Sequence, residues 1–314
     1  MNIVFLSILI YNWGMKEIIV NKENNSNKIS KVVLSSYPYL SRNLLQKLFR
    51  KKDIKVNGNR IKDDIPVYFK DKIEIYCSDN LLLGLPTNIK YYYEDDNILV
   101  AYKPSKIECH NDKTNSTFEY AVKLDRKDTN LKVCHRLDTN TEGLVIFSKN
   151  EISHKEMLHA FKNSLIHKTY LTFVYGKVPK NHDILENYIL KDNKYGYSKI
   201  VEKALPTAKP AITEYTLIEY IPNINVSILN VTLHTGRTHQ IRAHMKYLYT
   251  PIIGDSKYST NKINKLFGYK NQLLYAIKYS FDFDNASPLS YLNNISIYLN
   301  QDEIISKFKE RQNI

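Results

Sequence analysis

The sequence places one carboxylate and one cation close together just before an apolar run. Arg136 and Asp138 stand in the segment HRLDTNTEG, and residues 144–147, which read LVIF, follow it. A short apolar run bounded by a turn is typical of a buried strand, and a loop at a strand end holds functional side chains in place. Asp138 is therefore the first candidate for a catalytic group. An ordinary salt bridge between Arg136 and Asp138 is the alternative explanation.

The HRLDTNTEG segment resembles the active-site motif of the RluA family of pseudouridine synthases, whose usual form is HRLDxxTSG. The resemblance implies that Asp138 is the essential residue of an enzyme that isomerises uridine in RNA to pseudouridine. Glu142 departs from the motif, because the family usually has Ser at that position.

Two further blocks offer partners for Asp138. KTYLTFVYG resembles the KxYxxxVxG block of the family, which implies that Tyr170 lies against the target base, where its ring suits stacking. LHTGRTHQIRAH resembles the LxTGRTHQIRxH block. It implies that Arg242 pairs with the catalytic Asp and that Arg237 supports the turn or contacts RNA. A guanidinium suits this pairing because it stays charged and can engage a carboxylate through two donors.

Two weaker blocks add to the resemblance, which runs from residue 28 to about residue 308 when the basic N-terminal unit described below is included. AYKPSKIECHND resembles the first block of the family, although Lys106 replaces a usual Gly. Lys103 in this block either contacts phosphate or caps the end of a strand. PIIGDSKYS resembles the HPIIGDxxYG block, with Ser259 in place of Gly.

Pseudouridine formation breaks the bond between N1 of uracil and C1′ of ribose, rotates the base and joins C5 to C1′. Nothing is consumed and no electrons are transferred, so we expect no cofactor and no metal. The reaction needs an unstacked base, an ionised carboxylate held by a cation, and an acceptor for the C5 proton. Asp138 acts either as nucleophile or as base toward the C2′ proton, and the sequence leaves both routes open. Arg136 would hold phosphate or help to keep the nucleotide extruded.

Neither the histidines nor the cysteines predict a metal site. His234, His239 and His244 recur at five-residue steps, and such a step turns about 500° around a helix, unlike the i, i+4 spacing of a zinc pair. We therefore expect structural histidines. The cysteines, at positions 77, 109 and 134, fit neither a disulfide framework nor a zinc knuckle, which favours a reducing cytoplasm.

Length and charge limit the class of protein. A chain of 314 residues exceeds the usual size of one domain, so a large and a small domain are expected. The formal net charge of +13 implies an anionic partner such as nucleic acid. Residues 1–13 are mostly apolar but too few to span a bilayer, and they lack the features of a targeting signal. We expect no membrane association, and we hypothesise that translation starts at Met15.

The N-terminal part is expected to contain an extension, a small domain and a linker. Residues 1–27 form the extension, because the Asn-rich run that ends it has little to bury and predicts disorder. Residues 28–76 read as two helices, with Ser41 as a possible cap of the second, followed by a hairpin at residues 57–58 and a closing strand. Residues 77–88 are polar and contain Gly and Pro, which is typical of a linker.

Residues 89–314 are expected to form the catalytic domain. Alternating apolar residues predict a strand over 168–174 and an antiparallel hairpin formed by 212–220 and 226–234. Together with the resemblance, this pattern predicts a mixed α+β fold of the pseudouridine synthase type with a largely antiparallel sheet. The small domain before it would be an α+β unit.

The small domain is strongly basic. Residues 28–62 contain ten Lys or Arg residues against Asp53 alone, and SRNLLQKLFRKKDIKVNGNRIK resembles the S4 RNA-binding domain that often precedes the catalytic domain in this family. A solvated Lys-rich face that serves solubility is the alternative. We favour RNA docking, through Arg42, Lys47, Arg50, Lys51 and Lys55.

Two other functions are compatible with parts of the sequence. The departures at Lys106, Glu142 and Ser259 would suit an inactive RNA-binding protein of the same fold. Asp138 and Glu142 could form the carboxylate pair of a glycosidic hydrolase, although the other blocks have no hydrolase counterpart. We favour a synthase that acts as a monomer in the cytoplasm on large-subunit ribosomal RNA, with tRNA as the second candidate substrate.

Overall fold

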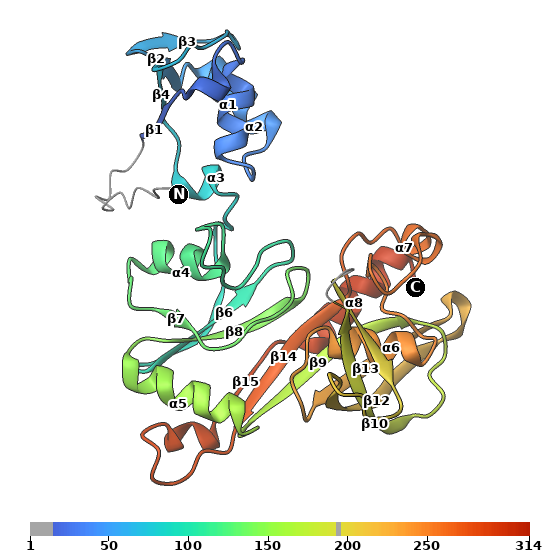
Figure 1. Cartoon of the computed structure of the whole chain (residues 1–314). Coiled ribbons are helices and arrows are strands. Elements are labelled where there is room, and N and C mark those ends of the chain that lie inside the picture. The colour runs from blue at the N-terminus through green and yellow to red at the C-terminus, as the bar shows by residue number, and fades with distance from the viewer. Residues whose placement is uncertain (1–14, 193–195) are drawn as a thin grey trace. The chain divides into compact units, whose positions relative to one another are not determined.

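The computed structural model describes residues 15–192 and 196–314, which divide into two compact units (Figure 1). The first unit runs to Thr87 and the second runs from Asn88 to the C-terminus, with Asp112–Ser116 grouped with the first. No helix among these residues is long and apolar enough to cross a membrane. The hypothesis about translation start concerns residues 1–14, which lie outside the described residues.

The first unit combines a four-stranded antiparallel sheet, in the order β1-β4-β2-β3, with short helices. Both predicted helices are present, and the hydroxyl of Ser41 caps the second by accepting a hydrogen bond from the Leu44 amide at 3.1 Å. Asn57 and Gly58 have positive φ angles of 50° and 82°, as the predicted hairpin turn requires. The elements are β1 (Lys16–Ile19), a 3-10 turn (Lys22–Asn24), α1 (Ile29–Ser36), α2 (Arg42–Lys51), β2 (Ile54–Val56), β3 (Asn59–Ile61), β4 (Lys72–Ile75) and α3 (Asp79–Leu82).

The expectation of a disordered extension up to residue 27 is wrong for residues 15–27. Strand β1 pairs with β4 over its whole length, with Ile18 opposite Ile73, and Val20 is buried in the core of the unit. The asparagines make defined turns rather than a flexible run. The side chain of Asn21 caps the 3-10 turn, and that of Asn25 accepts a hydrogen bond from the Phe69 amide.

The predicted linker is also partly folded. Helix α3 lies within residues 77–88, and Cys77 and Leu82 are buried in the apolar core of the first unit. In the sequence, Cys77 and Leu82 stand in a segment without regular apolar spacing, so their burial could not be predicted. The first unit therefore extends to Thr87.

The second unit is built on one large, mostly antiparallel sheet, with strand order β11-β10-β12-β13-β9-β14-β8-β6-β5. Strand β15 also pairs with β14, and β7 with β8. Strands β14 and β8 are parallel, whereas the other strand pairs of the described part of the unit are antiparallel. The strands are β5 (Tyr91–Glu94), β6 (Ile98–Lys103), β7 (Lys132–Val133), β8 (Glu142–Ser148), β9 (Ile166–Tyr175), β10 (His182–Asp192), β11 (Tyr197–Val201), β12 (Lys209–Ile221), β13 (Val226–Leu233), β14 (Leu274–Phe281) and β15 (Ser296–Tyr298).

The sheet confirms the strand predicted around residue 170, as β9, and the long hairpin, as β12 and β13. Their turn is a 3-10 segment, Pro222–Ile224. A further 3-10 segment, Ser290–Asn294, precedes β15. The helices of the unit are α4 (Phe118–Arg126), α5 (Glu151–Lys162), α6 (Gln240–Tyr247), α7 (Asn261–Phe267) and α8 (Gln301–Gln312).

Gly143 fixes the start of β8 against β14. Its φ angle is 122°, and a Cβ atom there would lie 2.3 Å from the carbonyl oxygen of Ala276. Only glycine allows the two backbones to approach so closely. The turn that carries Asp138 is therefore anchored to the centre of the sheet.

Candidate active site

Asp138 lies in the turn between β7 and β8. The Thr141 amide donates a hydrogen bond to the Asp138 carbonyl at 3.0 Å and closes the turn. The hydrophobic residues at both ends are buried, with Leu137 8% and Leu144 0% exposed, whereas the Asp138 side chain remains 26% exposed. The carboxylate is thus held by a rigid support and is still open to solvent.

Lys103 holds the same turn through its buried ammonium group. Its side chain is fully buried, and its Nζ donates to the carbonyl oxygens of Pro104, Ile107 and Thr139 at 2.8–3.0 Å. The assignment of Lys103 to RNA binding is therefore wrong, and the alternative of a cap at the strand end is correct. Burial lowers the pKa of the Lys103 ammonium to about 8.

Arg242 joins Asp138 to a second, buried carboxylate. Its Nη1 donates to Oδ2 of Asp138 at 2.7 Å, while Nε and Nη2 donate to the two carboxylate oxygens of Asp255 at 2.7 and 3.0 Å. Sequence reasoning anticipated a contact between Arg242 and Asp138, but the two-donor fork faces Asp255 instead. A planar guanidinium bound in this way has little freedom to rotate. Asp255 therefore fixes the direction from which Arg242 meets Asp138.

The surroundings keep Arg242 charged. Burial acts to lower its pKa, but the hydrogen bonds and charges of Asp255 and Asp138 outweigh burial, so the pKa is raised. The ring of Tyr258 lies 4.9 Å from the guanidinium carbon and adds a cation–π contact. Two carboxylates around one cation leave a net negative charge in this cluster.

Tyr170 lies on β9 close to Asp138. Its side chain is buried, and its pKa is raised, first by burial and then by the negative charge of Asp138. The phenol therefore stays protonated at neutral pH. The structure thus brings together Asp138, Tyr170 and Arg242, which are separated by up to 104 residues in the sequence.

The other two arginines named from the motifs lie differently. Arg136 is exposed, and no acidic side chain among the described residues pairs with it, so the salt bridge between Arg136 and Asp138 is not formed. Arg237 donates from Nε to the carbonyl oxygen of Pro210 at 3.0 Å. Arg237 therefore supports the turn before α6.

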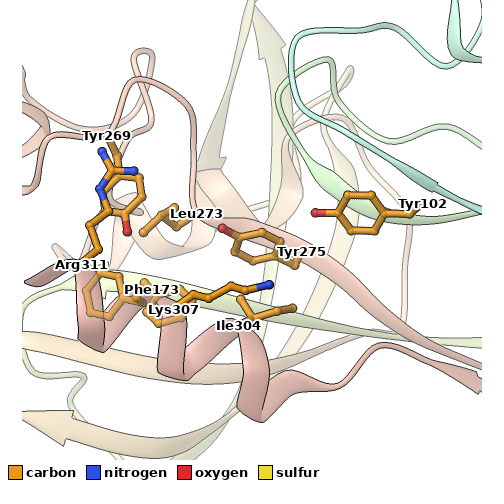
Figure 2. Close-up of a pocket in the computed structure, with 9 residues that line it drawn as sticks. Tyr102, Phe173, Tyr269, Leu273, Tyr275, Ile304, Lys307 and Arg311 are labelled. Carbon is orange, nitrogen blue, oxygen red and sulfur yellow. The ribbon is translucent and has the colours of Figure 1, made fainter. Parts of the chain in front are cut away.

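Glu142 points away from this cluster. Its Oε2 accepts a hydrogen bond from the Tyr102 hydroxyl at 2.6 Å. Tyr102 and Tyr275 help to line a pocket of about 290 Å³ together with Phe173 (Figure 2). Because Phe173 follows Tyr170 by three residues on β9, the two side chains lie on opposite faces of the strand. Glu142 is thus turned toward the face opposite to Tyr170.

The Lys106 departure has a conformational explanation. Lys106 has a φ angle of 70°, in the left-handed region that glycine adopts without strain. This backbone conformation explains why the family prefers Gly at this position. Lys106 adopts the same conformation at a cost in conformational free energy. The substitution leaves the loop after β6 in place.

Sequence reasoning missed three residues that the fold brings to this region. Asp255 was noted only as part of a block, and His239 was interpreted as structural. His239 Nε2 lies 3.8 Å from Oδ2 of Asp138. Lys168, on the same face of β9 as Tyr170, is nine-tenths buried with its pKa lowered by burial, and no acidic side chain of the described residues pairs with it. The sequence signal for Lys168 was its position two residues before Tyr170, because residues two apart on a strand lie on the same face.

The three histidines of the third block have separate partners. His234 lies 2.8 Å from Glu214, His244 lies 2.8 Å from Thr213, and His239 lies 3.0 Å from the Tyr258 hydroxyl. Within residues 15–192 and 196–314, no group of three His, Cys, Asp or Glu residues could hold a metal ion.

In the first unit, the residues predicted to bind RNA line the basic helix and the strand after it. Arg42, Lys47, Arg50 and Lys51 on α2 are exposed, and none of them pairs with an acidic side chain in the part of the chain that the structure describes. Lys55 on β2 lies 4.9 Å from the centre of the Tyr76 ring.

Comparison with known proteins identifies the family. Residues 97–247 match the RNA pseudouridylate synthase family. Ribosomal large subunit pseudouridine synthase C of Rickettsia felis is 33% identical over 256 residues, which cover 76% of this chain and 83% of that protein. An uncharacterized RNA pseudouridine synthase of Mycoplasma genitalium is 31% identical and covers 93% of this chain and 97% of its own length. The chain therefore belongs to the RNA pseudouridylate synthase family, and it is an RNA-modifying isomerase.

Solved structures agree on the fold. Human RNA pseudouridylate synthase domain containing 1 superposes with a TM-score of 0.55 at 19% identity, covering 71% of this chain and 95% of that one. Human RNA pseudouridylate synthase domain containing 4 gives 0.56 at 18% identity, covering 71% of this chain and 92% of that one. The predicted α+β fold of the pseudouridine synthase type is confirmed.

Proposed function

We propose that Asp138 is the catalytic carboxylate of this synthase and that Arg242 and Tyr170 are its catalytic partners. The observation that carries the proposal is the 2.7 Å contact between Arg242 Nη1 and Asp138 Oδ2 in a cluster that keeps Arg242 charged. An ionised carboxylate that is open to solvent and backed by a rigid cation is what cleavage of the glycosidic bond requires.

The geometry assigns a task to each partner. Arg242 holds one oxygen of Asp138, so the other can act on the nucleotide as nucleophile or as base toward the C2′ proton. The protonated phenol of Tyr170 would lie against the flipped uracil and could pass a proton during the loss of hydrogen from C5. Arg136, which is exposed and has no acidic partner in the described part of the chain, would contact a phosphate of the extruded nucleotide.

Large-subunit ribosomal RNA is the substrate we propose. The relatives from Rickettsia felis and Buchnera aphidicola are named ribosomal large subunit pseudouridine synthases C and D, at 33% and 32% identity. Transfer RNA is the second candidate. The enzyme would then act in the cytoplasm, where ribosomes are assembled.

We further propose that the first unit is an S4-like domain that docks the RNA. Its support is the row of exposed cations on α2 that pair with no acidic side chain of the described residues, because such cations bind phosphates through counterion release. Arg42, Lys47, Arg50, Lys51 and Lys55 would provide the contacts, and the chain would act as a monomer.

The test is tritium release from C5-tritiated uridine in unmodified ribosomal RNA. We expect release by the wild type and a loss of at least about 10³-fold in Asp138→Ala, with unchanged RNA affinity. A wild type that is inactive on ribosomal RNA and tRNA would instead favour an RNA-binding protein without activity. Free uracil and an abasic site among the products would favour the hydrolase.

A further inference from the structure

We propose that His239 is a positioning residue of the reaction, which holds one oxygen of Asp138 through its Nε2–H group and leaves the other oxygen for the substrate. The proposal rests on the function proposed above, in which Asp138 carries the chemistry. His239 is the N-cap residue of α6, and Arg242 lies in the first turn of the same helix. One helix therefore brings both groups to the same carboxylate.

His239 and Arg242 approach the same atom of Asp138. Nε2 of His239 is 3.8 Å from Oδ2, and Nη1 of Arg242 is 2.7 Å from it. Within the described residues no hydrogen bond or ion pair reaches Oδ1. A hydrogen bond from His239 needs about 3.2 Å or less, and catalytic hydrogen bonds commonly tighten when substrate binds. In the free protein, Oδ2 of Asp138 already faces Arg242 and His239, whereas Oδ1 is left for the substrate.

Tyr258 determines which nitrogen of His239 carries the proton. Its hydroxyl oxygen accepts a hydrogen bond from the Ser198 amide at 2.6 Å and lies 3.0 Å from Nδ1 of His239. In this proposal the phenol donates its proton to Nδ1. A neutral imidazole then carries its hydrogen on Nε2, the atom nearest Asp138. Burial raises the pKa of Tyr258 to about 12, so the phenol keeps its proton.

The buried surroundings of His239 favour its neutral form. Burial lowers its pKa most, and the positive charges of Arg242 and Lys257 act in the same direction. The carboxylates of Asp138 and Asp255 raise the pKa but do not offset the other contributions. A neutral donor can orient Asp138 without adding a second positive charge that would weaken it as nucleophile or base.

The backbone also holds the ring in place. His239 has φ 56° and ψ 23°, in the left-handed region, and its ring meets the Tyr258 ring edge-on at 5.6 Å. A residue with a Cβ atom in this conformation is strained, and such strain persists where the surroundings fix it, often at functional sites. Asn tolerates the left-handed conformation well, which provides a way to separate the backbone role from the imidazole role.

The experiment compares His239→Gln with His239→Asn. The amide nitrogen of Gln can reach the place of Nε2, whereas that of Asn reaches only the place of Nδ1. We expect single-turnover tritium release from C5-tritiated ribosomal RNA to fall about 10- to 100-fold in His239→Asn and to stay within about 3-fold of wild type in His239→Gln. RNA affinity should not change in either variant.

Tyr258→Phe is the companion variant, because it leaves the ring and removes the proton that sets the tautomer. We expect a loss in rate for Tyr258→Phe alone and no additional loss when it is combined with His239→Asn. Thermal unfolding of all variants controls for folding.

Three results would overturn the inference. These are wild-type rates in every His239 variant, a His239→Asn variant that is faster than His239→Gln, or a loss confined to RNA affinity. Asp138→Ala separates the two proposals. Retained activity in Asp138→Ala contradicts the proposed function, whereas an inactive Asp138→Ala beside fully active His239 variants contradicts this inference alone.

Discussion

Arginine and lysine serve different purposes in the two units. On α2 of the first unit they are exposed and pair with no acidic side chain of the described residues. In the second unit, Arg242 and Lys103 are buried and their donors are used by carboxylates and carbonyl oxygens. The difference teaches that net charge alone does not locate binding residues. Exposure and the existing partners of each cation decide whether it is open to an external anion or holds other residues of the protein in place.

The largest effect, on both stability and activity, is expected from replacing the buried cation Arg242. In Arg242→Met, the carboxylates of Asp255 and Asp138 lose their partner, and breaking a buried pair from one side costs about 3–5 kcal/mol. We expect this loss in urea unfolding, together with loss of tritium release. The double variant Arg242→Met/Asp255→Leu should recover stability but not activity. Equal stability of Arg242→Met and wild type would contradict the structural role of the pair.

Exposed cations should affect binding alone. We expect Lys47→Gln/Lys51→Gln on α2 to weaken RNA affinity about 5- to 20-fold and to reduce the slope of log affinity against log salt by about 1.5. The single-turnover rate at saturating RNA should not change. Lys262→Gln/Lys265→Gln on α7 is the matched control, with the same loss of charge on the other unit. Equal weakening in both variants would mean that only net charge matters.

As pH falls, the second unit should lose stability before the first unit does. His244 is buried, and burial lowers its pKa to about 4, below the value near 6.5 of the unfolded chain. Its contribution to stability is therefore complete above pH 6.5 and is lost as pH falls toward 4, by up to about 1.4 kcal/mol per pH unit. His244→Asn should flatten the pH dependence of unfolding free energy in this range. The first unit has no histidine, so hydrogen exchange there should respond less; the reverse order would contradict this assignment.

The smallest effect is expected at the departure from the family motif. Glu142→Ser removes the hydrogen bond that the carboxylate accepts from Tyr102, on the face opposite to Tyr170 and away from the proposed reacting groups. Tritium release should stay within about 3-fold of wild type. A loss as severe as that of Asp138→Ala would mean that Glu142 takes part in the chemistry.

Local patterns were enough for much of the fold. Apolar spacing predicted both helices of the first unit and strand β9, and Asn57 with Gly58 predicted the hairpin, because these signals depend only on neighbouring residues. The Asn-rich run before residue 28 misled the prediction. The run is held by hydrogen bonds to Val67 and Phe69, about forty positions further along the chain, and composition does not reveal such contacts.

The sequence by itself determined the family and named candidate residues for the chemistry, because ordered blocks of Asp, Tyr and Arg are local and specific. Only the tertiary structure decided how they are used. In the folded protein, Lys103 is buried under the turn that carries Asp138, and two donors of Arg242 bind Asp255. Glu142 points away from Asp138, whereas His239 lies close to it. The physical reason is that burial and partners arise from contacts between distant segments, and these contacts determine whether a charged group stays exposed, forms a pair or positions another.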